Sequence, residues 1–61
     1  MNIEPGQTWE MYSRAENRWV SVIVTKIEDG RVTLRYEGLV EFIRVELEDM
    51  QTKPEVFRPA T

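Results

Sequence analysis

The sequence contains neither cysteine nor histidine among its 61 residues. Without cysteine it forms no disulfide, and without either residue it lacks the usual ligands of a structural zinc site. Histidine and cysteine also supply many of the general bases and nucleophiles of enzymes, so the chain is poorly equipped for catalysis. We therefore expect a non-enzymatic protein that carries no metal and no cofactor.

Long apolar stretches are missing as well. The longest apolar run, Val22–Val24, is far shorter than the roughly 20 residues that a membrane-spanning helix needs. Glu4 and Pro5 stand where a secretory signal requires a basic and then an apolar segment. We expect no membrane association and a cytoplasmic location, with which the lack of cysteine agrees.

The charge balance is acidic, with 8 basic and 11 acidic side chains and a net charge of −3. Binding to nucleic acid depends on a basic surface, and here the basic residues are scattered singly along the chain. The acidic group Glu46, Glu48 and Asp49 lacks the spacing of a calcium loop and is expected to form a solvated surface. A nucleic-acid ligand is therefore disfavoured.

Apolar and polar residues alternate through most of the chain, which is the pattern of half-buried strands. Asp29-Gly30, between two such stretches, is a strong signal for a type I′ hairpin turn. The pattern predicts strands at Gln7–Tyr12, Trp19–Glu28, Val32–Tyr36, Val40–Val45 and Val56–Arg58, with one helical turn at Leu47–Met50 before the last strand. A chain this short forms one domain over residues 1–61, with a loose arm at 1–5 and a loose end at 59–61.

The long second strand loses its alternation, because Val24 and Ile27 are three residues apart. An uninterrupted hairpin would set Thr25 opposite Leu34, which mismatches the apolar faces. One extra residue at Thr25–Lys26, a β-bulge, brings Val24 opposite Leu34 and bends the strand. The expected pairs are then Val22 with Tyr36, Val24 with Leu34, Ile27 with Val32 and Glu28 with Arg31.

The fourth strand follows a turn at Glu37–Leu39. A three-residue turn would place Glu41 opposite Arg35 and Phe42 opposite Leu34. Opposite charges would then pair, and two apolar side chains would meet in the core. Phe42 and Ile43 are adjacent, however, and both are apolar. A second irregularity is therefore expected in this strand.

Five short strands, a bent second strand and a helical turn before the last strand predict an all-β fold, a small SH3-like barrel. Within that class the sequence resembles Tudor-type domains, in the early Gly6 and Trp9, in Trp19 followed by alternating apolar residues, and in Val32–Tyr36. Tudor domains that read methylated lysine or arginine typically carry an Asp-Tyr-Gly-Asn-like segment after the third strand. This chain has Glu37-Gly38-Leu39-Val40 there, with no cage aromatic and no asparagine.

The aromatic residues divide into two groups. Trp9, Tyr36 and Phe57 fall on inward positions and are expected in the core. Trp19 falls on the outer face, near the turn that contains Leu39. The expected binding site is an exposed apolar patch of Trp19, Ile23 and Leu39, bordered by Tyr12 and rimmed by Arg18, Arg35 and Glu37. The alternative is that Trp19 folds over one end of the barrel as part of a thin core.

These patterns favour a small interaction domain that binds a protein surface, a peptide or a second copy of itself. The acids Glu16 and Glu37 beside an aromatic patch favour a basic ligand. One alternative is a nucleic-acid-associated barrel that uses Arg14, Arg18, Lys26, Arg31 and Arg35 together. Others are a structural protein with no ligand of its own, and an enzyme whose site exists only in a ring-shaped oligomer.

Overall fold

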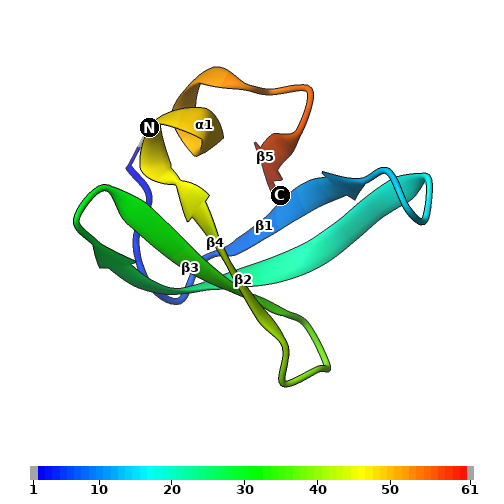
Figure 1. Cartoon of the computed structure of the whole chain (residues 1–61), viewed down its shortest axis with the longest axis horizontal. Coiled ribbons are helices and arrows are strands. Elements are labelled where there is room, and N and C mark those ends of the chain that lie inside the picture. The colour runs from blue at the N-terminus through cyan, green and yellow to red at the C-terminus, as the bar shows by residue number, and fades with distance from the viewer. Residues whose placement is uncertain (1, 61) are drawn as a thin grey trace.

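An antiparallel sheet of five strands and one short helix make up the protein, as seen in a computed structural model that describes residues 2–60 (Figure 1). The elements are β1 (Thr8–Ser13), β2 (Arg18–Glu28), β3 (Arg31–Tyr36), β4 (Phe42–Glu46), α1 (Leu47–Thr52) and β5 (Phe57–Pro59). The all-β prediction with a helical turn before the last strand is confirmed. No helix in the part of the chain that the structure describes has the length and apolar character of a membrane span.

The strand order is β4-β3-β2-β1-β5, so β4 and β5 are the two edges of the sheet. No ladder joins these edges within residues 2–60, and the sheet is curled but not closed into a barrel. Helix α1 follows β4 and leads towards β5, and it contacts both strands (Figure 1). Its one buried side chain, Met50, joins the core between the two edges.

The hairpin of β2 and β3 has the predicted register. Asp29 and Gly30 both have positive φ, 52° and 75°, as a type I′ turn requires. The ladder shifts between Val24 and Lys26, so Thr25 is the extra residue of the bulge, and its hydroxyl donates to the Thr33 carbonyl at 3.0 Å. The observed pairs include Val22 with Tyr36, Val24 with Leu34, Ile27 with Val32 and Glu28 with Arg31. The predicted bulge is confirmed.

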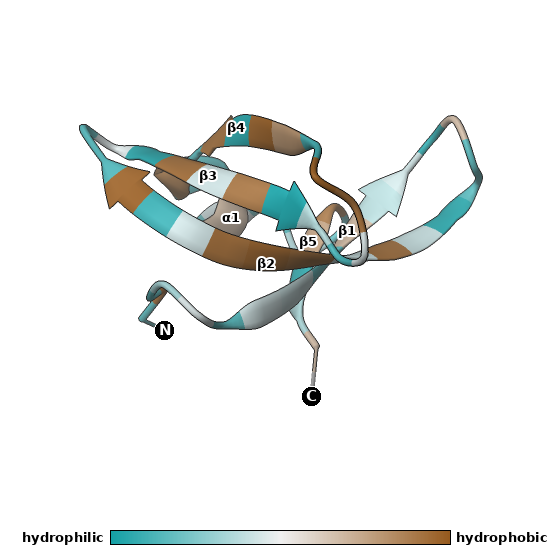
Figure 2. Cartoon of the chain, turned by 90° about the horizontal axis from the view of Figure 1, so that it is seen from below, coloured by the Kyte–Doolittle hydropathy of each residue, from teal (hydrophilic) through white to brown (hydrophobic). Residues whose placement is uncertain are grey.

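The core lies on the concave face of the curled sheet and consists of alternate residues of the strands together with Met50 of α1. Its buried members are Trp9, Val20, Val22, Val24, Val32, Leu34, Met50 and Phe57. In Figure 2 a polar stretch interrupts the brown of β2 near its arrowhead, where the bulge lies. The inward positions predicted for Trp9 and Phe57 are confirmed, while Tyr36 is half-buried against the rim of the core.

The prediction for the fourth strand was wrong by one residue. The Tyr36 N–H donates to the Glu41 carbonyl at 3.1 Å, so the loop holds four residues, 37–40, instead of three. Phe42 therefore lies opposite Arg35, and Ile43 lies opposite Leu34. Ile43 takes the inner position, and Phe42 points outwards with 56% of its surface exposed. The β3–β4 ladder also shows no register shift, so the second irregularity is absent from it.

The segments at the two ends of the described chain contact the sheet. Ile3 is half-buried and packs against the core. Beside the bulge, the Gly6 N–H donates to the Val24 carbonyl at 2.7 Å, and the Val24 N–H donates to the Gln7 carbonyl at 2.9 Å. The Ala60 N–H donates to the Thr8 carbonyl at 3.2 Å, next to β5. Residues 1 and 61, which belong to the expected arm and loose end, lie outside the described residues.

Candidate functional site

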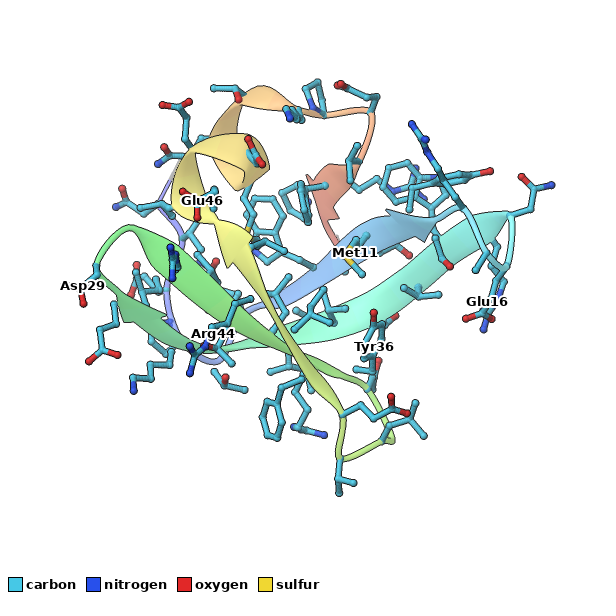
Figure 3. The ribbon with its side chains drawn as sticks, viewed as in Figure 1. Met11, Glu16, Asp29, Tyr36, Arg44 and Glu46 are labelled. Carbon is cyan, nitrogen blue, oxygen red and sulfur yellow. The ribbon has the colours of Figure 1, made fainter. Side chains whose placement is uncertain are left out.

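An open cleft of about 390 Å³ lies where the β1–β2 loop and the β3–β4 loop meet at one end of the sheet. The loop residue Glu16 and the first residues of β2 form one side, and Tyr36 with the following loop forms the other. Its lining residues are Glu16, Arg18, Val20, Ser21, Tyr36, Glu37 and Leu39. Figure 3 shows Tyr36 and Glu16 towards the same end of the molecule.

The electrostatics of the cleft leave one carboxylate without a cation. Arg18 and Glu16 form an ion pair, with Nη2 and Oε1 2.8 Å apart, so these two charges neutralise each other. The Glu37 carboxylate makes no ion pair with any described residue, although its backbone N–H donates to the Ser21 carbonyl at 3.1 Å. That hydrogen bond fixes the start of the loop, so Glu37 is held at the mouth of the cleft.

Tyr36 and Leu39 give the cleft its apolar surface. Tyr36 is half-buried against the core, and Leu39 is 52% exposed in the loop. The Leu39 carbonyl accepts a hydrogen bond from Arg35 Nη1 at 3.2 Å, which ties the loop back to β3. An aromatic ring, an exposed aliphatic side chain and a free carboxylate together suit a ligand group that is cationic at its tip and apolar along its stem.

Trp19 lies outside this cleft, on the outer face of the sheet, because its neighbour Val20 faces the core. Its ring packs edge-on against Tyr12, with centroids 5.6 Å apart and an interplanar angle of 75°. The guanidinium carbon of Arg58 lies 3.8 Å from the centroid of the Trp19 ring, and Arg58 Nε is 2.7 Å from Glu10 Oε1. A cation of the chain itself therefore covers one face of Trp19.

The six residues expected to form one site are thus distributed over three places. Glu37 and Leu39 line the cleft. Ile23 is half-buried on the outer face, paired with Arg35, and Arg35 braces the Leu39 loop. Trp19 and Tyr12 pack together with Arg58. Trp19 is half-buried there, and it neither lines the cleft nor belongs to the buried core.

Sequence reasoning missed two features of these surfaces. Tyr36 was expected in the core, yet it reaches the cleft because it is the last residue of β3, where the inner face opens to solvent. Its position at the strand end was a usable signal. Arg58 is 39 positions away from Trp19 in the sequence, and only the β1–β5 pairing of Glu10 with Arg58 brings it near.

A second hollow, of about 280 Å³, lies between α1, β5 and Ile3. Its walls include the core residues Trp9, Met50 and Phe57, so the hollow opens directly against the core. Among residues 2–60, acidic side chains are nowhere grouped in threes or more in a way that could hold a metal ion.

Comparison with known proteins yields no relative. No family model, no curated protein and no solved structure matches the chain.

Proposed function

We propose that the protein is a small non-enzymatic interaction domain that binds a basic side chain of a partner protein or peptide. The observation that carries this proposal is the shared cleft of Tyr36, Leu39 and the unpaired Glu37. A lysine or arginine placed there would contact an aromatic ring and a carboxylate together.

The physical basis is the sum of three modest terms. A cation over an exposed aromatic ring gains about 0.5–1 kcal/mol, and more where the pair is desolvated. The carboxylate of Glu37 adds an ion pair, and Leu39 offers apolar contact to the stem of the ligand side chain. The net charge of −3 favours the approach of a basic partner.

The SH3-like, Tudor-type assignment is part of this proposal. It is supported by the sequence resemblance, by the five strands with a bent β2 and by the helical turn before β5. Tyr36 is the one aromatic residue among those that line the cleft. We therefore propose a site for an ordinary basic side chain, without the aromatic cage of a methyl-lysine reader.

The nucleic-acid alternative is weakened by the partners of the basic residues. Of the five residues on which it depends, three make ion pairs with acidic neighbours. These pairs are Arg18 with Glu16 at 2.8 Å, Lys26 with Glu28 at 3.1 Å and Arg31 with Glu46 at 3.3 Å. Acidic groups beside the cations lower the attraction of the surface for phosphates.

The proposal is tested by an NMR titration of the ¹⁵N-labelled chain with a glycine-flanked lysine peptide. We expect millimolar affinity, which corresponds to about −4 kcal/mol, with shifts at the amides of Tyr36, Glu37 and Leu39. The same peptide with norleucine in place of lysine should shift these amides far less, because it keeps the stem and loses the charge.

A matched pair of variants gives the control. Glu37→Gln should weaken lysine binding severalfold, and Glu55→Gln, at an exposed position outside the cleft, should leave it unchanged. Equal shifts with lysine and norleucine, or no shifts at the cleft at several millimolar peptide, would reject the proposal. The absence of shifts would favour a structural protein with no ligand of its own.

A further inference from the structure

The hydrogen-bonding phase of the β3–β4 ladder is fixed by two bonds that flank it. The Tyr36 N–H donates to the Glu41 carbonyl at 3.1 Å, and the Leu47 N–H donates to the Gly30 carbonyl at 2.9 Å. In an antiparallel ladder, hydrogen-bonded and non-hydrogen-bonded pairs alternate. Moving two residues at a time along the ladder from either bond gives the same hydrogen-bonded pairs, Leu34 with Ile43 and Val32 with Val45.

That phase determines which residues of β4 face the open edge. Ile43 and Val45 exchange hydrogen bonds with β3. Phe42, Arg44 and Glu46 direct their backbone N–H groups away from β3, and within residues 2–60 these groups have no hydrogen-bond partner. An edge strand of this kind is a template for another strand.

The edge at β5 differs, because its outward positions offer no free donor. The Tyr12–Val56 and Ala60–Thr8 bonds set the phase of the β1–β5 ladder, and in this phase the backbone nitrogens of Phe57 and Pro59 point away from β1. The Phe57 N–H already donates to the Lys53 carbonyl at 3.0 Å. Pro59 has no N–H. A second copy cannot readily join its β4 to this β5, so a head-to-tail assembly is disfavoured.

The side chains of β4 are self-complementary in an antiparallel arrangement. Arg44 and Glu46 are two residues apart, so they share the outer face, and both are exposed. We propose that a second copy of this chain pairs its β4 with this β4 about a two-fold axis at Val45. Each Arg44 then lies opposite the partner's Glu46, which gives two opposite-charge pairs on one face.

The neighbouring register is disfavoured by charge, because an axis at Arg44 would set the two Arg44 side chains opposite each other. In the proposed register the cross-strand row Glu28, Arg31, Glu46 continues into the partner's Arg44, so that charges alternate across the boundary. Glu46 has extended backbone, with φ −74° and ψ 132°, although α1 begins after it. The strand is therefore competent to pair up to that residue.

This surface is distinct from the cleft of the proposed function. Figure 3 shows Arg44 and Glu46 on one side of the molecule, with Tyr36 and Glu16 towards the other. The paired segment is short, so we expect an interface below standard size and a weak, concentration-dependent dimer. The exposed Phe42 would then lie beside the start of the partner's α1.

The test is sedimentation equilibrium of the full chain from about 20 µM to about 1 mM, a range suited to weak affinities. The wild type should form a dimer over this range. Arg44→Glu and Glu46→Arg should each weaken self-association about tenfold or more, because each replaces two attractive pairs by two repulsive ones. An equimolar mixture of the two variants should form a heterodimer, since every pair across the axis is then opposite in charge.

Arg14→Glu is the control, because it makes the same charge change in the exposed β1–β2 loop and should leave the dimer intact. Far-UV circular dichroism of each variant checks that the fold persists. A wild type that stays monomeric at about 1 mM, or variants that fail to associate when mixed, would overturn the proposal. Lysine-peptide binding by Arg44→Glu should remain normal, so failure of the dimer and failure of the cleft are separable.

Discussion

Each edge strand of the sheet carries one phenylalanine, and the two side chains have opposite surroundings. Phe57 of β5 is 7% exposed and belongs to the core, whereas Phe42 of β4 is 56% exposed. The backbone shows the same contrast, because the Phe57 N–H is bonded to Lys53 and the Phe42 N–H has no partner within residues 2–60. In the described part of the chain, the outer edge of β5 thus offers no free N–H group, whereas the outer edge of β4 keeps N–H groups that a partner strand could bind.

The difference follows from where the chain goes after each strand. The segment between α1 and β5 folds over the outer side of β5, with Val56 and Phe57 both donating to the Lys53 carbonyl at 3.0 Å. After β4 the chain turns inwards, and α1 places Met50 in the core. Nothing in residues 2–60 then covers the outer edge of β4. One end of the sheet is protected by its connection, and the other is available for a partner.

The largest expected effect comes from the two phenylalanines. Phe57→Ala should lower the free energy of unfolding by about 3–5 kcal/mol, because it removes a buried aromatic ring from a thin core. That loss is a large part of the stability of a small domain. Phe42→Ala should change the free energy of unfolding by less than about 0.5 kcal/mol. Urea denaturation of both variants measures the contrast, and equal losses would show that the two edges are built alike.

Proline substitutions at adjacent residues of β4 probe the direction of its backbone groups. Ile43→Pro removes an N–H that bonds β3 and also a half-buried side chain, so we expect a loss of about 2–3 kcal/mol. Arg44→Pro removes an outward N–H and should cost less than about 1 kcal/mol, while abolishing self-association. Thermal melts and sedimentation give both readouts. A reversed order of the two losses would mean that the phase of the ladder is wrong.

The two tryptophans extend the comparison to the faces of the sheet. Trp9 is 3% exposed, and Trp9→Ala should cost about 3–5 kcal/mol. Trp19 is half-buried on the outer face, and its contacts with Tyr12 and Arg58 make Trp19→Ala cost about 1–2 kcal/mol. Denaturant melts rank the pair. If Trp19→Ala unfolds the domain as Trp9→Ala does, the assignment of Trp19 to the outer face is wrong.

Opening the protected edge should change the oligomeric state more than the stability. Pro59→Ala gives β5 an outward N–H and should change the free energy of unfolding by less than about 1 kcal/mol. With both edges open, β4 of one copy can join β5 of the next, and such head-to-tail contacts extend without closing. We expect species larger than a dimer in sedimentation velocity. An unchanged distribution of species would show that Pro59 does not protect this edge.

The register of the β2–β3 hairpin could be predicted from the sequence. The apolar alternation of β2 does not fit the pairing set by the Asp29-Gly30 turn unless β2 contains a bulge. The Asp29-Gly30 turn fixes the pairing, and Val24 and Leu34 then face each other only if one residue is extra. The strand and helix bounds agree with the predictions to within two residues at every end. Short-range patterns therefore determined most of the fold.

The start of β4 could not be predicted in the same way. A three-residue loop would pair Glu41 with Arg35 and bury Phe42 opposite Leu34. The residue pattern was therefore consistent with a loop length that the structure does not have. The hydrogen bond from the Tyr36 N–H to the Glu41 carbonyl sets the loop length at four residues, and no residue pattern in the sequence predicts this bond. The same limit applies to Trp19, whose exposure depends on Arg58 from the other end of the chain. Local sequence patterns do not predict contacts between segments that are far apart in the chain.

Amide hydrogen exchange of the wild-type chain tests the contrast between the edges most directly. At about 20 µM, where a weak dimer is largely dissociated, the Phe57 amide should be protected, and the Arg44 and Glu46 amides should exchange rapidly. At about 1 mM protection should appear at Arg44 and Glu46 while Phe57 stays unchanged. Protection of Arg44 and Glu46 at both concentrations, or at neither, would contradict the account of β4 as an open edge that pairs with a second copy.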